Sequence, residues 1–207
     1  MKISILGMPG SGKGTQIEQI EKDFDVNVLS MGKVLRNISE KKTKLGKKID
    51  KLIGKGKFVT SKLINKMILK KLRHKNIVFD GYPREIIEAR FIDSKLKLDF
   101  VFLLNTSDKT AINHLKNRRA CSCGMTYNLL TKKPEKNNIC NRCGKKLMHR
   151  EDDKPNTIKK RIEIYRKKTI PVVNHYRKKG ILIEINANKA IKPVYEQIKE
   201  NLNSLKN

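Results

Sequence analysis

The chain has 207 residues, and its 48 lysines and arginines outnumber 20 acidic residues to give a formal net charge of +28. This length accommodates one α/β core with one or two small insertions, rather than several independent domains. Because the chain contains no stretch of about 18 apolar residues and opens without a signal-peptide pattern, we expect a cytosolic protein that does not cross a membrane.

The strong positive charge is compatible with non-specific binding of nucleic acids. Lysine is, however, spread along every segment, and aromatic residues make up only 5% of the chain. No basic run alternates with aromatic side chains as a base-stacking surface requires. We therefore favour a general lysine bias, and keep a nucleic-acid-binding protein as an alternative.

The stretch KISILGMPGSGKGTQ near the N-terminus predicts a strand, a glycine-rich loop and the start of a helix. Glycines let backbone N–H groups approach phosphate oxygens, and the following helix N-terminus favours anions. The phosphate-loop pattern G-x-x-x-x-G-K fits at Gly7, Gly12 and Lys13. Gly14 stands where a serine or threonine is usual, and the hydroxyl follows at Thr15. We therefore predict a phosphate-binding loop.

Short apolar runs alternate with helical patterns along the rest of the chain, which predicts a parallel sheet with right-handed crossovers. In chain order we expect a strand at 3–6, a helix through 24, a strand at 26–29, two short helices within 30–56, a helix at 60–73, a strand at 76–80, a helix at 85–94, a strand at 100–104, a helix at 107–118, a helix from 157 that breaks or kinks at Pro171 and resumes to 179, a strand at 181–185 and a helix from 189.

Ligands of parallel sheets bind at the carboxyl ends of the strands. The first predicted strand delivers the phosphate loop to that edge, and the third delivers Asp80, Gly81 and Arg84. Charged elements from distant parts of the sequence are therefore expected to converge there.

The four cysteines lie in two turns, CSCG at 121–124 and CNRCG at 140–144. Four thiolates at this spacing suit a tetrahedral structural Zn²⁺ site, which would hold together an insertion too small to bury a core. All four ligand positions would be filled, so the metal would stabilise rather than catalyse. The alternative is a decayed site that binds metal weakly. The expected ligands are Cys121, Cys123, Cys140 and Cys143.

Several motifs occur in the order seen in adenylate kinases with a zinc-type lid, and this resemblance spans essentially the whole chain. A phosphate loop alone is shared with many NTPases, whereas a DGYPR turn followed by two arginine motifs is specific to nucleoside monophosphate kinases. The motifs are GMPGSGKGTQ, LSMGKVLR, GKFVT, FDGYPRE, NRR, REDD and KKRIEIYRKKTIP.

The resemblance implies an α/β P-loop NTPase fold, with a five-stranded parallel sheet flanked by helices. It implies a core at 1–29, 60–118 and 156–207, a monophosphate-binding insertion at 30–59 and a zinc-ribbon lid at 119–155. It also implies a monomer that takes part in nucleotide homeostasis.

The implied activity is reversible transfer of the terminal phosphoryl group of Mg-ATP to AMP, giving two ADP. Such chemistry requires positioning and charge neutralisation, which lysine, arginine and a metal ion supply. Asp80 would orient the Mg²⁺ ion through its water shell. The implied catalytic residues are Lys13, Asp80, Arg84, Arg118, Arg150 and Arg161.

Two nucleotide sites follow from the same resemblance, and arginine suits them because its planar fork binds phosphate oxygens bidentately. The implied ATP-binding residues are Gly10, Ser11, Gly12, Lys13, Gly14, Thr15, His114, Arg118 and Lys189. The implied AMP-binding residues are Met31, Arg36, Phe58, Val59, Gly81, Arg84, Glu88, Arg150 and Arg161.

The chain departs from the family pattern at several of these positions. Met31 replaces a small hydroxyl residue, Lys33 an acid and His114 an arginine, while the first cysteine pair is C-x-C instead of C-x-x-C. Glu88 stands where a glutamine reads the monophosphate base. A carboxylate offers only acceptors, which suit the two donors of guanine better than the donor and acceptor of adenine.

We expect AMP to be the acceptor, with GMP or a pyrimidine monophosphate as the alternative. A nucleic-acid-binding protein on a degenerate kinase fold is a third possibility, suggested by the charge and the zinc ribbon. The presence of Lys13, Asp80, Arg84 and Arg118 argues against such degeneration.

Overall fold

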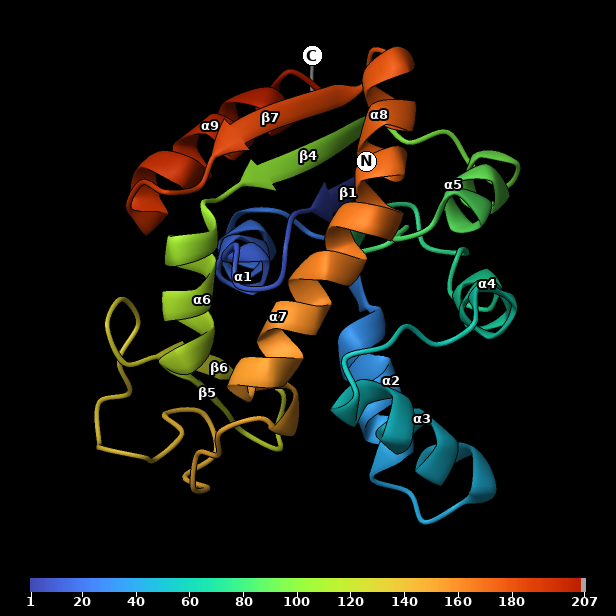
Figure 1. Cartoon of the computed structure of the whole chain (residues 1–207). Helices are drawn as coiled ribbons and strands as arrows, with labels where there is room; N and C mark the ends of the chain where they lie inside the picture. The colour runs from blue at the N-terminus through green and yellow to red at the C-terminus, as the bar shows by residue number, and fades with distance from the viewer. Residues whose placement is uncertain (206–207) are drawn as a thin grey trace.

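Five parallel strands form the central sheet of the computed structural model, which describes residues 1–205 (Figure 1). All their pairings are parallel, and the spatial order is β2-β3-β1-β4-β7, which confirms the predicted α/β fold. The strands are β1 (Lys2–Leu6), β2 (Asn27–Ser30), β3 (Ile77–Asp80), β4 (Phe100–Asn105) and β7 (Leu182–Asn186).

Strand β4 shows why these apolar runs form a sheet that is buried on both faces. Val101 and Leu103 belong to one hydrophobic cluster, whereas Phe102 and Leu104 belong to another. Successive side chains of a strand point to opposite faces, so a continuous apolar run fills two cores at once.

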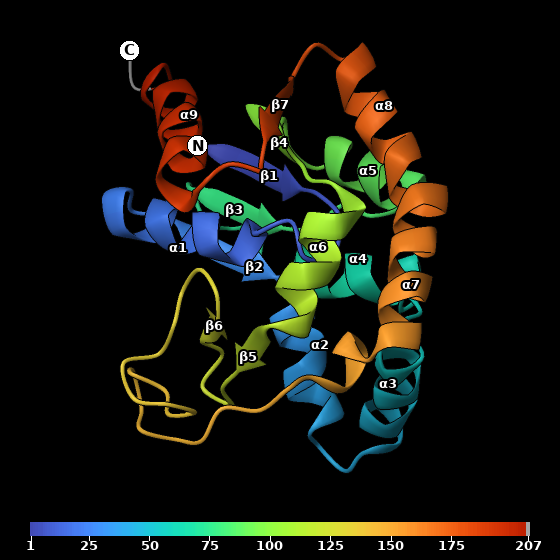
Figure 2. The ribbon, with the colours of Figure 1, turned by 60° about the vertical axis from the view of Figure 1, so that its left-hand side comes forward.

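Helices cover both faces of the sheet (Figures 1 and 2). Ile20 of α1 and Ile198 of α9 belong to one core cluster, whereas Ile68 of α4, Ile92 of α5 and Tyr176 of α8 belong to the other. The helices are α1 (Lys13–Asp23), α4 (Ser61–Leu69), α5 (Ile86–Asp93), α6 (Asp108–Lys116), α7 (Pro155–Ile164), α8 (Ile170–Lys178) and α9 (Ile191–Asn203).

Two excursions leave this core and lie at the same end of the molecule (Figure 2). The first contains the predicted pair of short helices, α2 (Met31–Ser39) and α3 (Lys44–Gly54). The second, here called the cysteine segment, covers residues 118–153. It contains β5 (Arg118–Ala120), the antiparallel β6 (Thr126–Asn128) and the 3₁₀ turn η1 (Glu151–Asp153).

The structure corrects two predicted boundaries. The helix expected at 60–73 ends at Leu69, where turns replace it. The break or kink predicted at Pro171 takes the form of a π-helical turn, η2 (Tyr165–Thr169), which lies directly before α8 and not at the proline itself. Pro171 lies in the first turn of α8, where a missing N–H is tolerated, so the helical path widens upstream of the proline. Among residues 1–205 no helix is long and apolar enough to span a bilayer.

Candidate active site

A cavity of about 570 Å³ lies where β1, β2 and β3 end and the two excursions begin. Its wall brings together every residue predicted to bind a nucleotide or to act in catalysis. These are Gly10, Ser11, Gly12, Lys13, Gly14, Thr15, Met31, Arg36, Phe58, Val59, Asp80, Gly81, Arg84, Glu88, His114, Arg118, Arg150, Arg161 and Lys189.

The loop between β1 and α1 has a backbone that requires glycine. Gly10 has φ +90°, and a Cβ there would lie 2.3 Å from the carbonyl oxygen of Ala111. Gly12 precedes α1 in the left-handed conformation, with φ +85°. A glycine loop that ends on a helix N-terminus presents N–H groups and a partial positive charge to an anion.

Lys13 folds back over this loop, where its Nζ donates hydrogen bonds to the carbonyl oxygens of Gly7 (2.6 Å) and Met8 (2.9 Å). Burial lowers the pKa of Lys13 to about 7, although Asp80 acts in the opposite direction. His114 also contacts the loop, since its Nδ1 lies 2.9 Å from the carbonyl oxygen of Gly10. A carbonyl only accepts, so Nδ1 carries the hydrogen.

Asp80 ends β3 and accepts a 2.6 Å hydrogen bond from Ser30 Oγ at the end of β2. The two residues are opposite each other in the parallel register. Ser30 also caps α2, because its Oγ accepts from the backbone N–H of Lys33 at 3.4 Å. Sequence reasoning missed Ser30, although the neighbouring carboxyl ends of two strands were the signal that would have indicated it.

Arginines from separate elements surround the middle of the cavity. The Arg118 guanidinium donates to both carboxylate oxygens of Asp153, at 2.5 and 2.7 Å. Arg161 donates to Asp153 Oδ1 at 2.9 Å and to the carbonyl oxygen of Asp152 at 2.8 Å. Burial favours a higher pKa for Asp152, but Arg161 and Arg118 outweigh it and hold that pKa below its usual range.

Arg36 and Arg150 are less well balanced by acids. Burial lowers the pKa of both guanidinium groups, most strongly at Arg150, where Arg118 and Arg36 add repulsion. Arg150 Nε is buried and has no hydrogen-bond partner among the described residues. Because an uncompensated buried cation is costly, this part of the cavity is suited to a ligand with several negative charges.

At the α2 end of the cavity the wall is mainly apolar and includes Met31 and Val59, which are 3% and 5% exposed. The Arg84 guanidinium carbon lies 5.5 Å from the centre of the Phe58 ring. Glu88 is only 3% exposed, and its Oε2 accepts a 2.8 Å hydrogen bond from the Arg84 backbone N–H. Burial raises the pKa of this carboxyl group.

The opposite end of the cavity lies between α1, α6 and the connection from β7 to α9. His114 and Lys189 line it, together with the apolar residues Ile17, Ile191 and Val194. The sheet order explains the separation of the two ends, since β2 and β7 are the two edge strands. The cavity therefore has two partly apolar ends on either side of a cationic centre.

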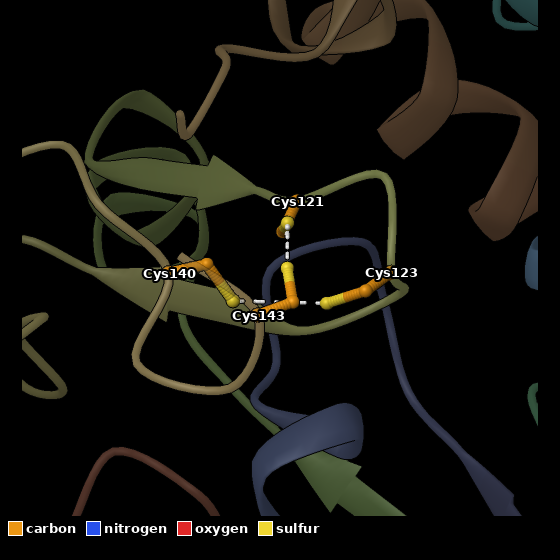
Figure 3. A group of neighbouring side chains, drawn as sticks. All are labelled: Cys121, Cys123, Cys140 and Cys143. Carbon is orange, nitrogen blue, oxygen red and sulfur yellow. Dashed lines mark hydrogen bonds between the residues drawn. The ribbon is translucent and has the colours of Figure 1, made fainter. Parts of the chain in front are cut away.

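The four cysteines converge in the cysteine segment, as Figure 3 shows. All four sulfur atoms lie within 4.8 Å of one another, with Cys121 and Cys143 3.4 Å apart and Cys123 and Cys140 3.6 Å apart. Zn–S bonds of about 2.3 Å give a tetrahedron with S···S edges of about 3.8 Å. The donor set and its size therefore fit a structural zinc ion, despite the short C-x-C turn.

Sequence reasoning also missed an ion pair between the cysteine segment and the core. Lys132 Nζ pairs with Glu18 Oε2 on α1, and both side chains line the cavity. A lysine and a glutamate 114 residues apart leave no local pattern in a lysine-rich sequence. Such a pair becomes visible only when the fold brings the two side chains together.

Phosphoryl transfer requires a phosphate loop with its lysine, an aspartate at the end of the neighbouring strand and converging arginines. This site contains all of these parts. Together with the two partly apolar ends of the cavity, they define a P-loop nucleoside monophosphate kinase. Comparisons with known proteins lead to the same class. The family model described as adenylate kinase matches residues 5–181, and the chain belongs to the adenylate kinase family.

Relatives match along nearly the full length of the chain. The chain is 37% identical to an adenylate kinase of Caldanaerobacter subterraneus subsp. tengcongensis, covering 98% of this chain and 96% of the relative. It is likewise 37% identical to an adenylate kinase of Kosmotoga olearia, covering 99% and 100%. An adenylate kinase of Archaeoglobus fulgidus is 32% identical and is covered over its full length.

Proposed function

We propose that this chain catalyses the reversible transfer of the terminal phosphoryl group of Mg-ATP to AMP, giving two ADP. The observation that carries the proposal is the convergence of Lys13 and five arginines between the two ends of one cavity. Two nucleotides with their phosphates facing each other would place the transferred group in this cationic centre. We further propose that the enzyme acts as a cytosolic monomer.

In this proposal the donor phosphates lie on the glycine loop, where backbone N–H groups and Lys13 hold them. The donor base occupies the end lined by His114 and Lys189. Asp80 would hold the Mg²⁺ ion that accompanies ATP through water molecules, and that ion supplies charge neutralisation on the phosphates. The hydrogen bond from Ser30 fixes the orientation of the Asp80 carboxylate.

The acceptor monophosphate occupies the other end, with Arg36 and Arg84 on its phosphate and Met31, Val59 and Glu88 around its base. Arg118, Arg150 and Arg161 close around the transferred group. This assignment agrees with the strong burial of Arg150 and Arg161, for which Asp152 and Asp153 are the nearby acids. Positioned cations of this kind stabilise the charge of the transition state.

We propose that residues 30–59 form a monophosphate-binding insertion and residues 119–155 a lid, moving relative to a core of residues 1–29, 60–118 and 156–207. The ion pair between Lys132 and Glu18 supports the assignment of the cysteine segment as a lid, because the pair joins this segment to α1 of the core. Closure would exclude water, which otherwise competes with AMP for the phosphoryl group.

GMP is the second candidate acceptor, and the buried carboxylate of Glu88 favours it. An ionised carboxylate accepts from both N1–H and the N2 amino group of guanine, whereas it faces the lone pair of adenine N1. The hydrogen bond from the Arg84 backbone N–H uses part of this acceptor capacity. Glu88 therefore has a structural role at the start of α5 in addition to any role in base selection.

The test is a set of initial rates from Mg-ATP to AMP, GMP, CMP and UMP for the wild type and Glu88→Gln. Fast transfer to AMP that changes little in the variant supports the proposal. A preference for GMP that the variant reverses would identify Glu88 as the base-selecting residue and contradict AMP as the acceptor. Absence of transfer to all four would contradict the kinase activity, and salt-dependent RNA binding would then be measured.

A further inference from the structure

Three residues of the cavity wall, Tyr127, Lys132 and Glu18, connect the cysteine cluster to helix α1. We propose that Tyr127 is a positioning residue that couples the metal site to closure of the cysteine segment over α1, so that bound zinc and bound donor nucleotide stabilise each other. The inference rests on the zinc and donor-nucleotide sites proposed above, and its test uses a signal other than phosphoryl transfer.

The first contact joins Tyr127 to the metal site. Its Oη lies 3.5 Å from Cys140 Sγ and accepts a 2.9 Å hydrogen bond from the backbone N–H of Asn141. Because that N–H already occupies one side of the hydroxyl, the hydroxyl hydrogen is free to point at the sulfur. A metal-bound thiolate only accepts, so Tyr127 would orient Cys140 as a zinc ligand.

The second contact joins the same ring to Lys132. Lys132 Nζ lies 5.7 Å from the centre of the Tyr127 ring, within the range of a cation–π interaction. Two backbone hydrogen bonds of 3.0 Å between Asn128 and Lys132 close the short loop that carries this lysine. The position of Lys132 therefore depends on Tyr127 and on the strand that holds it.

The third contact reaches the core. The ion pair of Lys132 with Glu18, here called the clasp, has side chains that are 27% and 22% exposed, so solvent screens it less than a surface pair. Glu18 lies on α1, the helix that begins at the phosphate loop. The clasp thus joins the cysteine segment to the element that would carry the donor phosphates.

These contacts form one continuous path from Cys140 through Tyr127 and Lys132 to Glu18. Zinc would fix Cys140 and Tyr127, which places Lys132 for the clasp. A donor nucleotide beneath the cysteine segment would favour the same closed arrangement. Since coupling between two binding sites is reciprocal in free energy, the nucleotide must then raise the affinity for zinc, and we expect this gain to be expressed as slower zinc release.

The experiment measures transfer of zinc from the zinc-loaded protein to a chromophoric chelator, with and without Mg-ATP and in the absence of AMP. For the wild type we expect Mg-ATP to slow release by about fivefold or more. For Tyr127→Phe we expect release about 10 to 100 times faster than in the wild type. Circular dichroism shows whether this variant, which retains the buried ring, is folded.

Two variants separate the clasp from the metal site. In Glu18→Gln and in Lys132→Gln, Mg-ATP should no longer slow zinc release, and the double variant should show no further loss, because one interaction has been removed in each case. The matched control is Asp23→Asn. Asp23 lies on α1 like Glu18, and this variant removes its ion pair with Lys199 of α9. It should keep the full effect of Mg-ATP.

Several results would overturn the inference. These are zinc release from Tyr127→Phe at the wild-type rate, full protection by Mg-ATP in both clasp variants, and a purified chain that takes up no zinc. Kinase assays on the same samples distinguish a failure of the proposed coupling from a failure of the proposed function. Normal phosphoryl transfer with zinc release that ignores Mg-ATP overturns the coupling alone.

Discussion

The Asp153 carboxylate pairs bidentately with the Arg118 guanidinium, at 2.5 and 2.7 Å, where the two ends of the cysteine segment meet. The Asp153 side chain is fully buried and that of Arg118 is 19% exposed. Arg161 donates to the same carboxylate. One acid therefore holds two of the arginines that we place around the transferred phosphoryl group.

We predict that Asp153→Asn destabilises the protein by about 3–5 kcal/mol, because Arg118 loses its carboxylate partner and Arg161 keeps only Asp152. Transfer should also slow by about 100-fold, since Arg118 and Arg161 lose their fixed positions. Chemical denaturation and initial rates measure the two effects. The control is Asp108→Asn, which removes the exposed pair with Arg166 and should cost about 0–1 kcal/mol. Equal losses in both variants would contradict the prediction.

Gly10→Ala is expected to distort the phosphate loop. A Cβ would lie 2.3 Å from the Ala111 carbonyl oxygen, and φ +90° is unfavourable for alanine. We expect a loss of about 1–3 kcal/mol in the free energy of unfolding and weaker ATP binding, measured by denaturation and calorimetry. Gly54→Ala is the control, because Gly54 lies in α3 and, beyond its chain neighbours and the backbone of that helix, no atom lies within 4 Å of the added Cβ. Unchanged ATP affinity in Gly10→Ala would contradict this view of the loop.

Glu88 should give a distinctive dependence of stability on pH. Its folded-state pKa is raised by burial, so the folded protein holds this proton over a pH range in which the unfolded chain has released it. Stability from this group is therefore lost as pH rises from the unfolded pKa through the folded one. Glu88→Gln should increase the free energy of unfolding more at pH 8 than at pH 4.5, in denaturation without nucleotides.

Glu85→Gln provides a control of opposite sign. Lys168 and Ser61 outweigh burial and lower the pKa of Glu85, so its contribution is present above the unfolded pKa and is lost as pH falls. This variant should be destabilised more at pH 8 than at pH 4.5. The same pH trend in both variants would show that the two carboxyl groups do not titrate as their surroundings indicate.

Removing zinc should loosen the cysteine segment while the core stays folded. The buried residues of the small cluster in this segment are Cys121, Tyr127, Cys140 and Leu147, too few to replace the metal. After treatment with a chelator, a lysine-specific protease should cut at Lys132, Lys133 or Lys136 first, as mass spectrometry would show. Equal cleavage rates before and after chelation would indicate that metal does not hold this segment.

Much of the site was predictable because its residues lie in short motifs next to strands. The glycine loop follows β1 and Asp80 ends β3, and parallel strands bring their carboxyl ends to one edge. The convergence of the cysteines likewise follows from their paired spacing. The roles assigned to the individual nucleotide-binding residues stay predictions, although the structure places all of them around one cavity.

Other features depend on tertiary packing and could not be predicted. The clasp between Glu18 and Lys132 joins residues without a shared motif. The sequence indicated a break or kink at Pro171, but it did not indicate that a π-helical turn at Tyr165–Thr169 would precede the proline. Glu88 was expected to face a base, and its hydrogen bond to the Arg84 backbone became visible only once the start of α5 was placed.

The bridge between Arg118 and Asp153 closes the cysteine segment at its base, so the chain leaves the core and returns to it at one point. The sheet pairs of the core involve only β1, β2, β3, β4 and β7. The segment consequently contributes no strand to the central sheet. A loop without cysteines, grafted between these two residues, should leave the register of the central sheet intact while it removes the metal site.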